Sequence, residues 1–320
     1  MRRRTPASRT DPDSMSNDVA RGGEKVALVT GANRGLGLAL VRGLCRSFGE
    51  SGIVYLGARS EERGSAAVRL LEGEGLSPRL SVLDVDSDDS VARAAERLAR
   101  EHGRVDVVIS NAARPITPQR PQRDQGADFV QTNNLGTHRM MRRFAPLLAD
   151  GARYLVVASG LGQLRYLEPV ARDHFDVTTM ALDDVERLLE DFVRDTVAGT
   201  ARAKGWGGWI NVPSKVAQVA SMKIFARGLR ADAERRDLLI DAVCPGLVDT
   251  DASRPWFNDM SRAQTPDAAA VDVLWLATLP IGSRQPYGEL VQHRRVLDFT
   301  KLVPGKTAAQ LLAEVGIVET

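Results

Sequence analysis

Short apolar runs alternate with longer stretches of helical apolar spacing from Lys25 onward, and few folds accommodate that order. The runs indicate buried strands, and stretches such as SVARAAERLAREHG indicate amphipathic helices between them. Because strands that alternate with helices are joined by right-handed crossovers, we predict an α/β fold: a doubly wound parallel sheet with helices on both faces, three layers in all. The predicted strands are KVALVTG, IVYLGAR, LSVLDV, VDVVISNAA, YLVVASG, LLIDAVCPG and, as a candidate for the last, GELVQHRR.

A single domain of residues 24–320 is expected, because neither an internal repeat nor a linker rich in proline, glycine or serine divides the chain. Residues 1–23 are polar and rich in arginine, serine and proline, which predicts a disordered tail. No apolar stretch follows that resembles a signal-peptide core or a membrane span, so we expect a cytoplasmic protein without a membrane partner. The two cysteines, Cys45 and Cys244, each lie in an apolar run, as reduced core residues do.

About fifty residues between Ser159 and Lys215 interrupt the strand–helix order. In this insertion, residues 163–208, we predict a helix packed on the body of the protein, because one helical face is apolar and the other is charged. The apolar face consists of Leu182, Val185, Leu188, Leu189, Phe192 and Val193. Ordered insertions often form lids or pocket walls, and aromatic residues nearby fit either a pocket wall or core packing: Trp206, Trp209 and the stretch 254–260.

Charge and histidine placement argue against two classes of ligand. The formal net charge is only +2 and the arginines are interleaved with acids, so we expect no nucleic-acid partner. The four histidines are scattered and lack the spacing of metal ligands, so no metal site is predicted.

The segment TGANRGLG, residues 30–37, follows the first predicted strand and opens the first predicted helix. Glycines at such a place allow a tight turn and let the backbone approach a pyrophosphate at the helix N-terminus. A glycine trio alone is a weak signal, but the strand before it and the helix after it supply the context that the motif requires. We therefore predict a Rossmann-like nucleotide site, with Gly31, Asn33, Arg34, Gly35, Leu36 and Gly37 in the turn.

The TGxxxGxG spacing resembles that of the short-chain dehydrogenase/reductase family, and more of the family's motifs follow in order over roughly residues 24–300. SNAA at 110–113 is similar to the family's NNAG, and TNNLGT at 132–137 carries its helix asparagine at Asn133. VVASG places Ser159 at the position of the family's serine, Lys215 matches its lysine, and PGLVDT at 245–250 is similar to its PGxxxT.

The insertion and the segments GANRGLGLALVRGLC and CPGLVDTD look most like the monomeric carbonyl reductase branch of that family. The resemblance implies a small-molecule substrate. It also implies a monomer, because the insertion of such members covers the usual pairing helix, although a homodimer stays open.

The cofactor expected for this chain is NADPH. An acid at the end of the second strand would bind the ribose of NAD, but Arg59 stands there and Arg34 lies in the glycine turn, and two guanidinium groups suit a 2′-phosphate. The resemblance further implies that Asp84 and Val85 flank the adenine, that Asn111, with Ala112 next to it, lines the ribose, and that Lys215 binds the nicotinamide ribose. Residues 245–250 would border the nicotinamide, with Pro245, Gly246, Val248 and Thr250 in contact.

The family's proton donor is missing. In the family, a tyrosine one turn before the lysine protonates the substrate oxygen; here WINVPSK aligns without a gap and places Asn211 at that position. The implied catalytic set is therefore Asn133, Ser159, Asn211 and Lys215. An asparagine amide donates a hydrogen bond but does not release a proton near neutral pH, and losing a general acid costs roughly 10²–10⁴ in rate where the reaction needs one.

Three explanations stay open. The chain is an inactive relative, or Tyr166, Asp173, His174 or a water on Lys215 supplies the proton, or the acceptor already carries positive charge, as an iminium carbon derived from a hemiaminal does. We favour the third and predict an NADPH-dependent reductase that delivers hydride to a C=N⁺ or C=O carbon of a sizeable molecule. The alternative is a non-redox enzyme (cyclase, dehydratase or isomerase) or a nucleotide-sensing protein on the same fold.

Overall fold

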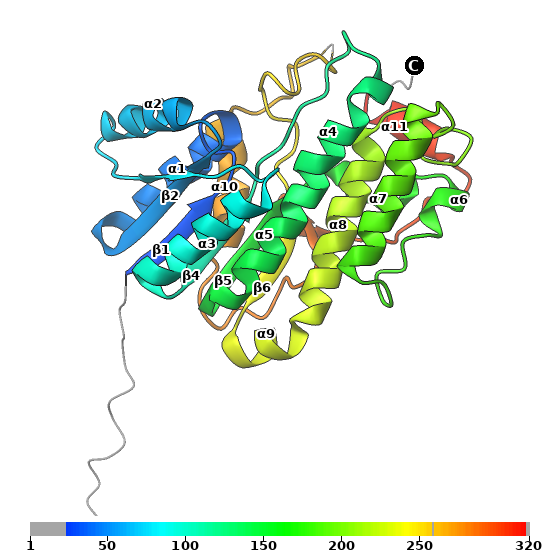
Figure 1. Cartoon of the computed structure of the whole chain (residues 1–320). Helices are drawn as coiled ribbons and strands as arrows, with labels where there is room; N and C mark the ends of the chain where they lie inside the picture. The colour runs from blue at the N-terminus through cyan, green and yellow to red at the C-terminus, as the bar shows by residue number, and fades with distance from the viewer. Residues whose placement is uncertain (1–23, 258, 318–320) are drawn as a thin grey trace, which may run out of the picture.

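The computed structural model describes residues 24–257 and 259–317, so the tail predicted for residues 1–23 lies outside the described residues. Its strands form one eight-stranded sheet in the order β3-β2-β1-β4-β5-β6-β7-β8 (Figure 1). The strands are β1 (Lys25–Val29), β2 (Gly52–Ala58), β3 (Arg79–Val82), β4 (Val105–Ser110), β5 (Leu148–Val157), β6 (Leu239–Cys244), β7 (Leu290–Gln292) and β8 (Arg295–Leu297).

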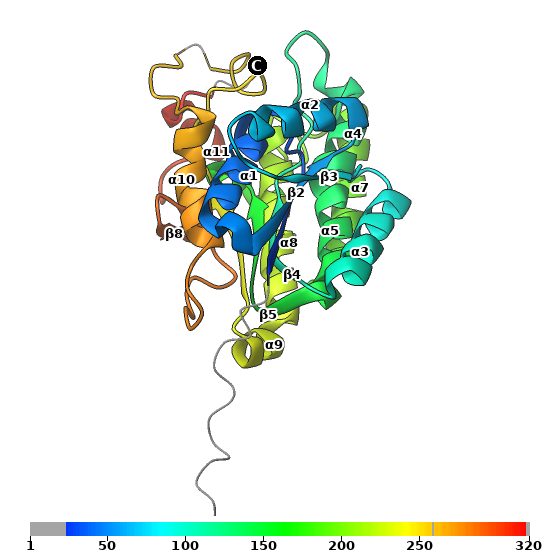
Figure 2. The ribbon, with the colours of Figure 1, turned by 90° about the vertical axis from the view of Figure 1, so that its left-hand side faces the viewer.

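Two apolar cores lie on opposite faces of this sheet, which confirms the predicted three layers. Figure 2 shows α1 and α10 on one face and α3, α5 and α8 on the other. The longer helices are α1 (Gly35–Phe48), α2 (Glu61–Glu72), α3 (Asp88–His102), α5 (Gly136–Phe144), α7 (Leu182–Val197), α8 (Asn211–Gly228) and α10 (Pro266–Ala277). The shorter ones are α4 (Gly126–Val130), α6 (Pro169–Arg172), α9 (Arg230–Arg236) and α11 (Ala308–Glu314).

The sheet departs from the prediction at its last strand. The stretch GELVQHRR does contain β7, parallel to β6, but β8 was not predicted and pairs antiparallel with β7. The two residues between these strands, His293 and Arg294, both have positive φ (48° and 59°), the backbone that a two-residue hairpin turn requires. Histidine is enriched at positive φ, but arginine is not and neither is a usual hairpin residue, so an all-parallel sheet was the wrong expectation at this edge.

The insertion contains the predicted helix, α7, and its apolar face points inward. Val185, Leu189 and Phe192 are buried, and Leu182, Leu188 and Val193 pack against the same core. α7 packs along α8, beside α5 (Figure 1). The insertion therefore covers one face of α8 and also packs against α4.

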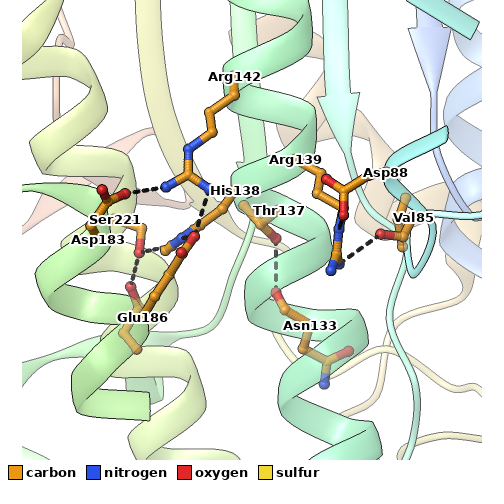
Figure 3. A network of polar contacts seen from close by, with 11 residues as sticks. Val85, Asp88, Asn133, Thr137, His138, Arg139, Arg142, Asp183, Glu186 and Ser221 are labelled. Carbon is orange, nitrogen blue, oxygen red and sulfur yellow. Dashed lines mark hydrogen bonds and ion pairs between the residues drawn. The ribbon is translucent and has the colours of Figure 1, made fainter. Parts of the chain in front are cut away.

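A polar cluster joins α7 to α5 and α8 (Figure 3). The ring of His138 in α5 is fully buried; its Nδ1 lies 2.8 Å from Glu186 Oε1 and its Nε2 lies 2.6 Å from Ser221 Oγ. Arg142 donates to both Glu186 and Asp183. Because a carboxylate only accepts hydrogen bonds, Nδ1 of His138 carries a proton, and Glu186 is held by two donors at once.

Replacing Glu186 by glutamine should lower the stability of the fold in a pH-dependent way. The hydrogen bond from His138, then that from Arg142, holds the pKa of Glu186 at about 2, against 4.5 for a free glutamate. A lowered pKa stabilises the folded state above the unfolded-state pKa, so the variant should lose about 2–3 kcal/mol at pH 7, and the difference from wild type should shrink as the pH falls below about 4.5.

Urea unfolding at pH 7 and at pH 3 measures this difference, because most of the carboxylate's contribution is lost only as the pH approaches its folded-state pKa of about 2. Glu190→Gln, at an exposed position of α7 one turn further on, is the matched control and should unfold like wild type. A Glu186→Gln deficit of equal size at both pH values would show that the carboxylate charge is not what stabilises the cluster.

Candidate active site

The glycine turn between β1 and α1 has the geometry of a nucleotide cradle. Gly31 and Gly35 have φ of 63° and 55°, a backbone that L side chains rarely adopt. A Cβ on Gly37 would lie 2.4 Å from the carbonyl oxygen of Gly31, so no larger residue fits there. Asn111, at the end of β4, locks the turn by donating to the carbonyls of Thr30 and Gly31 at 2.9 and 3.3 Å.

A cavity of about 740 Å³ opens on this turn at the carboxyl ends of β1, β2 and β4. That edge is where open α/β sheets bind ligands. It is lined by twelve of the residues predicted to hold the cofactor: Gly31, Asn33, Arg34, Gly35, Leu36, Gly37, Arg59, Asp84, Val85, Asn111, Ala112 and Thr250.

Positive charge gathers at the β2 end of the cavity. Arg34 and Arg59 line it as predicted, and Arg63, in the first turn of α2, adds a third guanidinium that the sequence analysis missed. The sequence did contain a signal for Arg63. Ser60 is a typical N-cap residue, so α2 begins directly after Arg59 and its first turn, which includes Arg63, lies beside Arg59. Arg34 pairs with Asp251 at 2.9 Å, but both side chains are about two-thirds exposed, so this pair yields readily to a phosphate.

Asn133 lies in a π-helical turn, Gln131–Leu135, between α4 and α5. Its side-chain amide accepts from the N–H of Arg114 at 2.7 Å and donates to the carbonyl of the same residue at 3.2 Å. Both ends of the amide therefore hold the loop after β4, and Asn133 positions the backbone of the site. Its own carbonyl oxygen accepts from Thr137 Oγ1 at 2.8 Å and from Gln218 Nε2 at 2.6 Å.

Ser159 and Asn211 carry free hydrogen-bonding capacity. Ser159 follows β5 and its Oγ accepts from the N–H of Leu161 at 3.2 Å, which leaves the hydroxyl proton available. Asn211 is the first residue of α8, and within the described parts of the chain no hydrogen bond holds its partly exposed amide. α8 packs against the turn Gly160–Gly162 that follows Ser159.

Lys215 lies one helical turn beyond Asn211, so the two share a face of α8. Its Nζ donates to Gln218 Oε1 at 2.7 Å. Burial, only slightly offset by the Cys244 thiol, lowers the pKa of Lys215 to about 8. At neutral pH the group is therefore an ammonium with two further N–H donors, close to the pH at which it loses its charge.

The cavity does not reach every predicted residue. Pro245, Gly246 and Val248 form the turn after β6, where Gln264 Nε2 donates to the carbonyl of Pro245 at 3.3 Å and Val248 is buried. These three residues lie outside the cavity lining, as do Asn133, Ser159, Asn211 and Lys215.

An aromatic pair lies between the cavity rim and the start of α8. Trp256 Nε1 donates to the carbonyl of Ile116, which lines the cavity, at 3.1 Å. The ring of Trp256 lies 5.5 Å from that of Trp209, two residues before Asn211; neither ring lines the cavity, and both pack in the apolar core. Trp206 packs with Phe175 and Phe192 inside the insertion, and it belongs to the same apolar core as Trp209.

The other groups considered as proton donors lie elsewhere. Tyr166 is buried, with its hydroxyl accepting from Arg165. Asp173 and His174 are exposed on the insertion, where the His174 ring stacks on Trp206. None of the three lines the cavity, and within the described residues no hydrogen bond or ion pair joins any of them to Asn211 or Lys215.

Among the residues that the structure describes, no group of three or more histidine, cysteine or acidic side chains has an arrangement fit for a metal ion. No helix in those same ranges has the length and apolar character needed to cross a membrane.

Comparisons with known proteins identify the family. A sequence profile described as short chain dehydrogenase matches residues 25–170. Carbonyl reductase (NADPH) 1 of Macaca fascicularis is 34% identical over 280 residues, which cover 86% of this chain and 99% of the relative. The Homo sapiens protein of that name is 34% identical over 278 residues, which cover 86% and 98%. The chain belongs to the short-chain dehydrogenase/reductase family and is close to its carbonyl reductases.

Solved structures agree on the fold. Salutaridine reductase from Papaver somniferum has a TM-score of 0.69 at 19% identity, over 83% of this chain and 99% of that one. Menthone neomenthol reductase from Mentha piperita has a TM-score of 0.68 at 23% identity, over 84% and 98%. At such identities the likeness concerns architecture alone.

Proposed function

We propose that this chain is an NADPH-dependent oxidoreductase whose preferred acceptor is an iminium carbon, formed by loss of water or hydroxide from a hemiaminal. Dependence on NADPH follows from the family, from relatives named as NADPH carbonyl reductases and from the arginines at the cavity rim. The choice of acceptor is the finer part of the proposal. It is carried by one observation: at the start of α8, where the family has its acid, the chain has an asparagine whose amide has no hydrogen-bond partner among the described residues.

The residues of the cavity fit the cofactor. Because Gly37 has no Cβ, the start of α1 packs directly against the glycine turn, and the N-terminus of α1 lines the cavity where a pyrophosphate would bind. Arg34, Arg59 and Arg63 would hold the 2′-phosphate by charge-assisted hydrogen bonds. The reduced nicotinamide, when bound, supplies a hydride.

The remaining polar groups orient the acceptor rather than protonate it. When a C=N⁺ carbon accepts a hydride, the π electrons become the lone pair of nitrogen, so the product is a neutral amine and no proton is consumed. Ser159 offers a free O–H and Asn211 offers both an N–H and a carbonyl oxygen, which suffice to orient a polar substituent next to the reacting carbon.

Incubation of the purified protein with NADPH and either a stable cyclic iminium salt or a panel of ketones tests this proposal. We expect the absorbance of NADPH to fall with the iminium salt and to change little with the ketones. Turnover of ketones alone would overturn the choice of acceptor. Tight NADPH binding without any oxidation would instead favour the non-redox alternative, a cyclase, dehydratase or isomerase.

We further propose a cytoplasmic protein that acts as a monomer, with a homodimer as the alternative. The packing of α7 along α8 supports the monomer, because it covers a helix face that would otherwise be open to a second copy. Light scattering on the purified chain decides between the two.

A further inference from the structure

Behind Lys215, a chain of hydrogen bonds leads away from the start of α8 into the protein. Lys215 Nζ donates to Gln218 Oε1 at 2.7 Å, and Gln218 Nε2 donates to the main-chain oxygen of Asn133 at 2.6 Å. Gln218 is only 3% exposed, and it joins α8 to the π-helical turn before α5. Lys215 and Asn133 belong to the family's motifs, but Gln218, which joins them, does not.

The orientation of the Gln218 amide follows from its partners. An ammonium has only N–H donors, so it must face the amide oxygen, and a carbonyl only accepts, so it must face the amide NH₂. Exchanging the two ends would set donor against donor and acceptor against acceptor. The bridge therefore fixes the position of Nζ relative to the backbone of Asn133, whose side chain in turn holds the loop after β4.

We propose that Gln218 is a positioning residue that anchors the Lys215 ammonium by direct contact and holds it relative to the main chain of Asn133. A carboxamide relays no proton near neutral pH, so this bridge transmits position without transmitting protons. The inference rests on the proposed function, in which the acceptor needs no proton at the hydride step. It deepens that proposal, because it names the residue that holds the lysine of the same site in place.

The surroundings of Lys215 make its titration a usable readout. The Cys244 thiol of β6 is the titratable neighbour that affects it, and Gly162 packs against its carbonyl. Burial lowers the pKa of Lys215 to about 8, within the range of ordinary labelling experiments. An anchoring amide oxygen stabilises the ammonium against this burial, and it also offsets part of the repulsion that a cationic acceptor would meet.

Competitive acylation of the full-length, cofactor-free protein across pH 6–11, with each lysine followed by mass spectrometry, measures this titration without any substrate. Only six lysines are present, so Lys25, Lys204, Lys223, Lys301 and Lys306 serve as internal references. We expect Gln218→Met, which removes the acceptor, to lower the Lys215 midpoint by roughly one pH unit. Gln218→Glu, which places a carboxylate there, should raise it by roughly one unit or more.

Ser221→Ala is the matched control, because Ser221 lies one turn further along α8, is buried and also bonds to α5, yet does not touch Lys215. It should leave the Lys215 midpoint unchanged. Opposite shifts in the two Gln218 variants support the proposal; a midpoint that matches wild type in both overturns it. If Gln218→Met does not fold, the direction found for Gln218→Glu decides alone. A failure of iminium turnover leaves this readout intact, so the two proposals fail separately.

Discussion

Replacing Asn211 by tyrosine should raise the turnover of ketones by roughly 10²–10⁴-fold, the usual contribution of a positioned general acid. The side chain at this position shares a face of α8 with Lys215, one turn away. The nearby ammonium favours the phenolate form, so it should lower the tyrosine pKa toward neutrality. Ser159 is already present with a free hydroxyl proton. The substitution would thus supply the one group that the site lacks for protonating an alkoxide.

Asn211→Phe is the matched control, since it has the same ring without the hydroxyl. We expect it to remain as poor with ketones as the natural chain, and turnover of the iminium salt to fall in both variants because the amide that orients the acceptor is lost. Steady-state kcat/KM for one ketone and one iminium salt, measured for all three proteins, gives the comparison. Equal ketone turnover by Asn211→Tyr and Asn211→Phe would show that the ring position, and not the missing proton, limits the natural enzyme.

Much of the fold followed from the sequence because strands and helices differ in the period of their apolar residues. All seven predicted strands are present, and α7 buries the face predicted for it. The exception, β8, depends on two residues with positive φ, and residue identity predicts such a backbone reliably only for glycine. A local hairpin at a sheet edge is therefore decided by tertiary contacts more than by pattern.

The site was predictable where function requires a particular backbone, and less so where it depends on packing. Gly31, Gly35 and Gly37 were recognisable because only glycine fits their φ values or their close approaches. Gln218 was not recognisable, because a glutamine three residues beyond a lysine is ordinary on any helix surface, and only the fold brings Asn133 to its other end.

The aromatic residues show the same limit. Two tryptophans three residues apart in the sequence have different neighbours. Trp206 packs on Phe192 of the insertion, and Trp209 packs on Trp256 beside the start of α8. Burial and aromatic content are the same for both, so composition does not predict which neighbours each one packs on.

Removing two of the cavity's arginines together, by Arg34→Ala and Arg59→Ala, should weaken NADPH binding by roughly 10²–10⁴-fold while it changes NADH binding only about 3-fold or less. Each charge-assisted hydrogen bond to a phosphate contributes about 1.5–3 kcal/mol, and a tenfold change in Kd corresponds to about 1.4 kcal/mol. Breaking the Arg34–Asp251 ion pair on cofactor binding costs little of this binding energy, since both side chains are about two-thirds exposed and such pairs are weak. Arg63 remains in the double variant, which places the expected loss nearer the lower end of the range.

Titration calorimetry with both dinucleotides measures the effect at one ionic strength. The matched control is Arg69→Ala with Arg93→Ala, which removes the same amount of charge from exposed positions of α2 and α3 outside the cavity lining. If the control weakened NADPH binding as much as the test variant, long-range attraction would be the cause, whereas direct contact predicts a loss confined to Arg34 and Arg59. Equal weakening of NADPH and NADH in the test variant would mean that these arginines hold the pyrophosphate and not the 2′-phosphate. The cofactor preference would then have to come from Arg63, the third guanidinium at this end of the cavity.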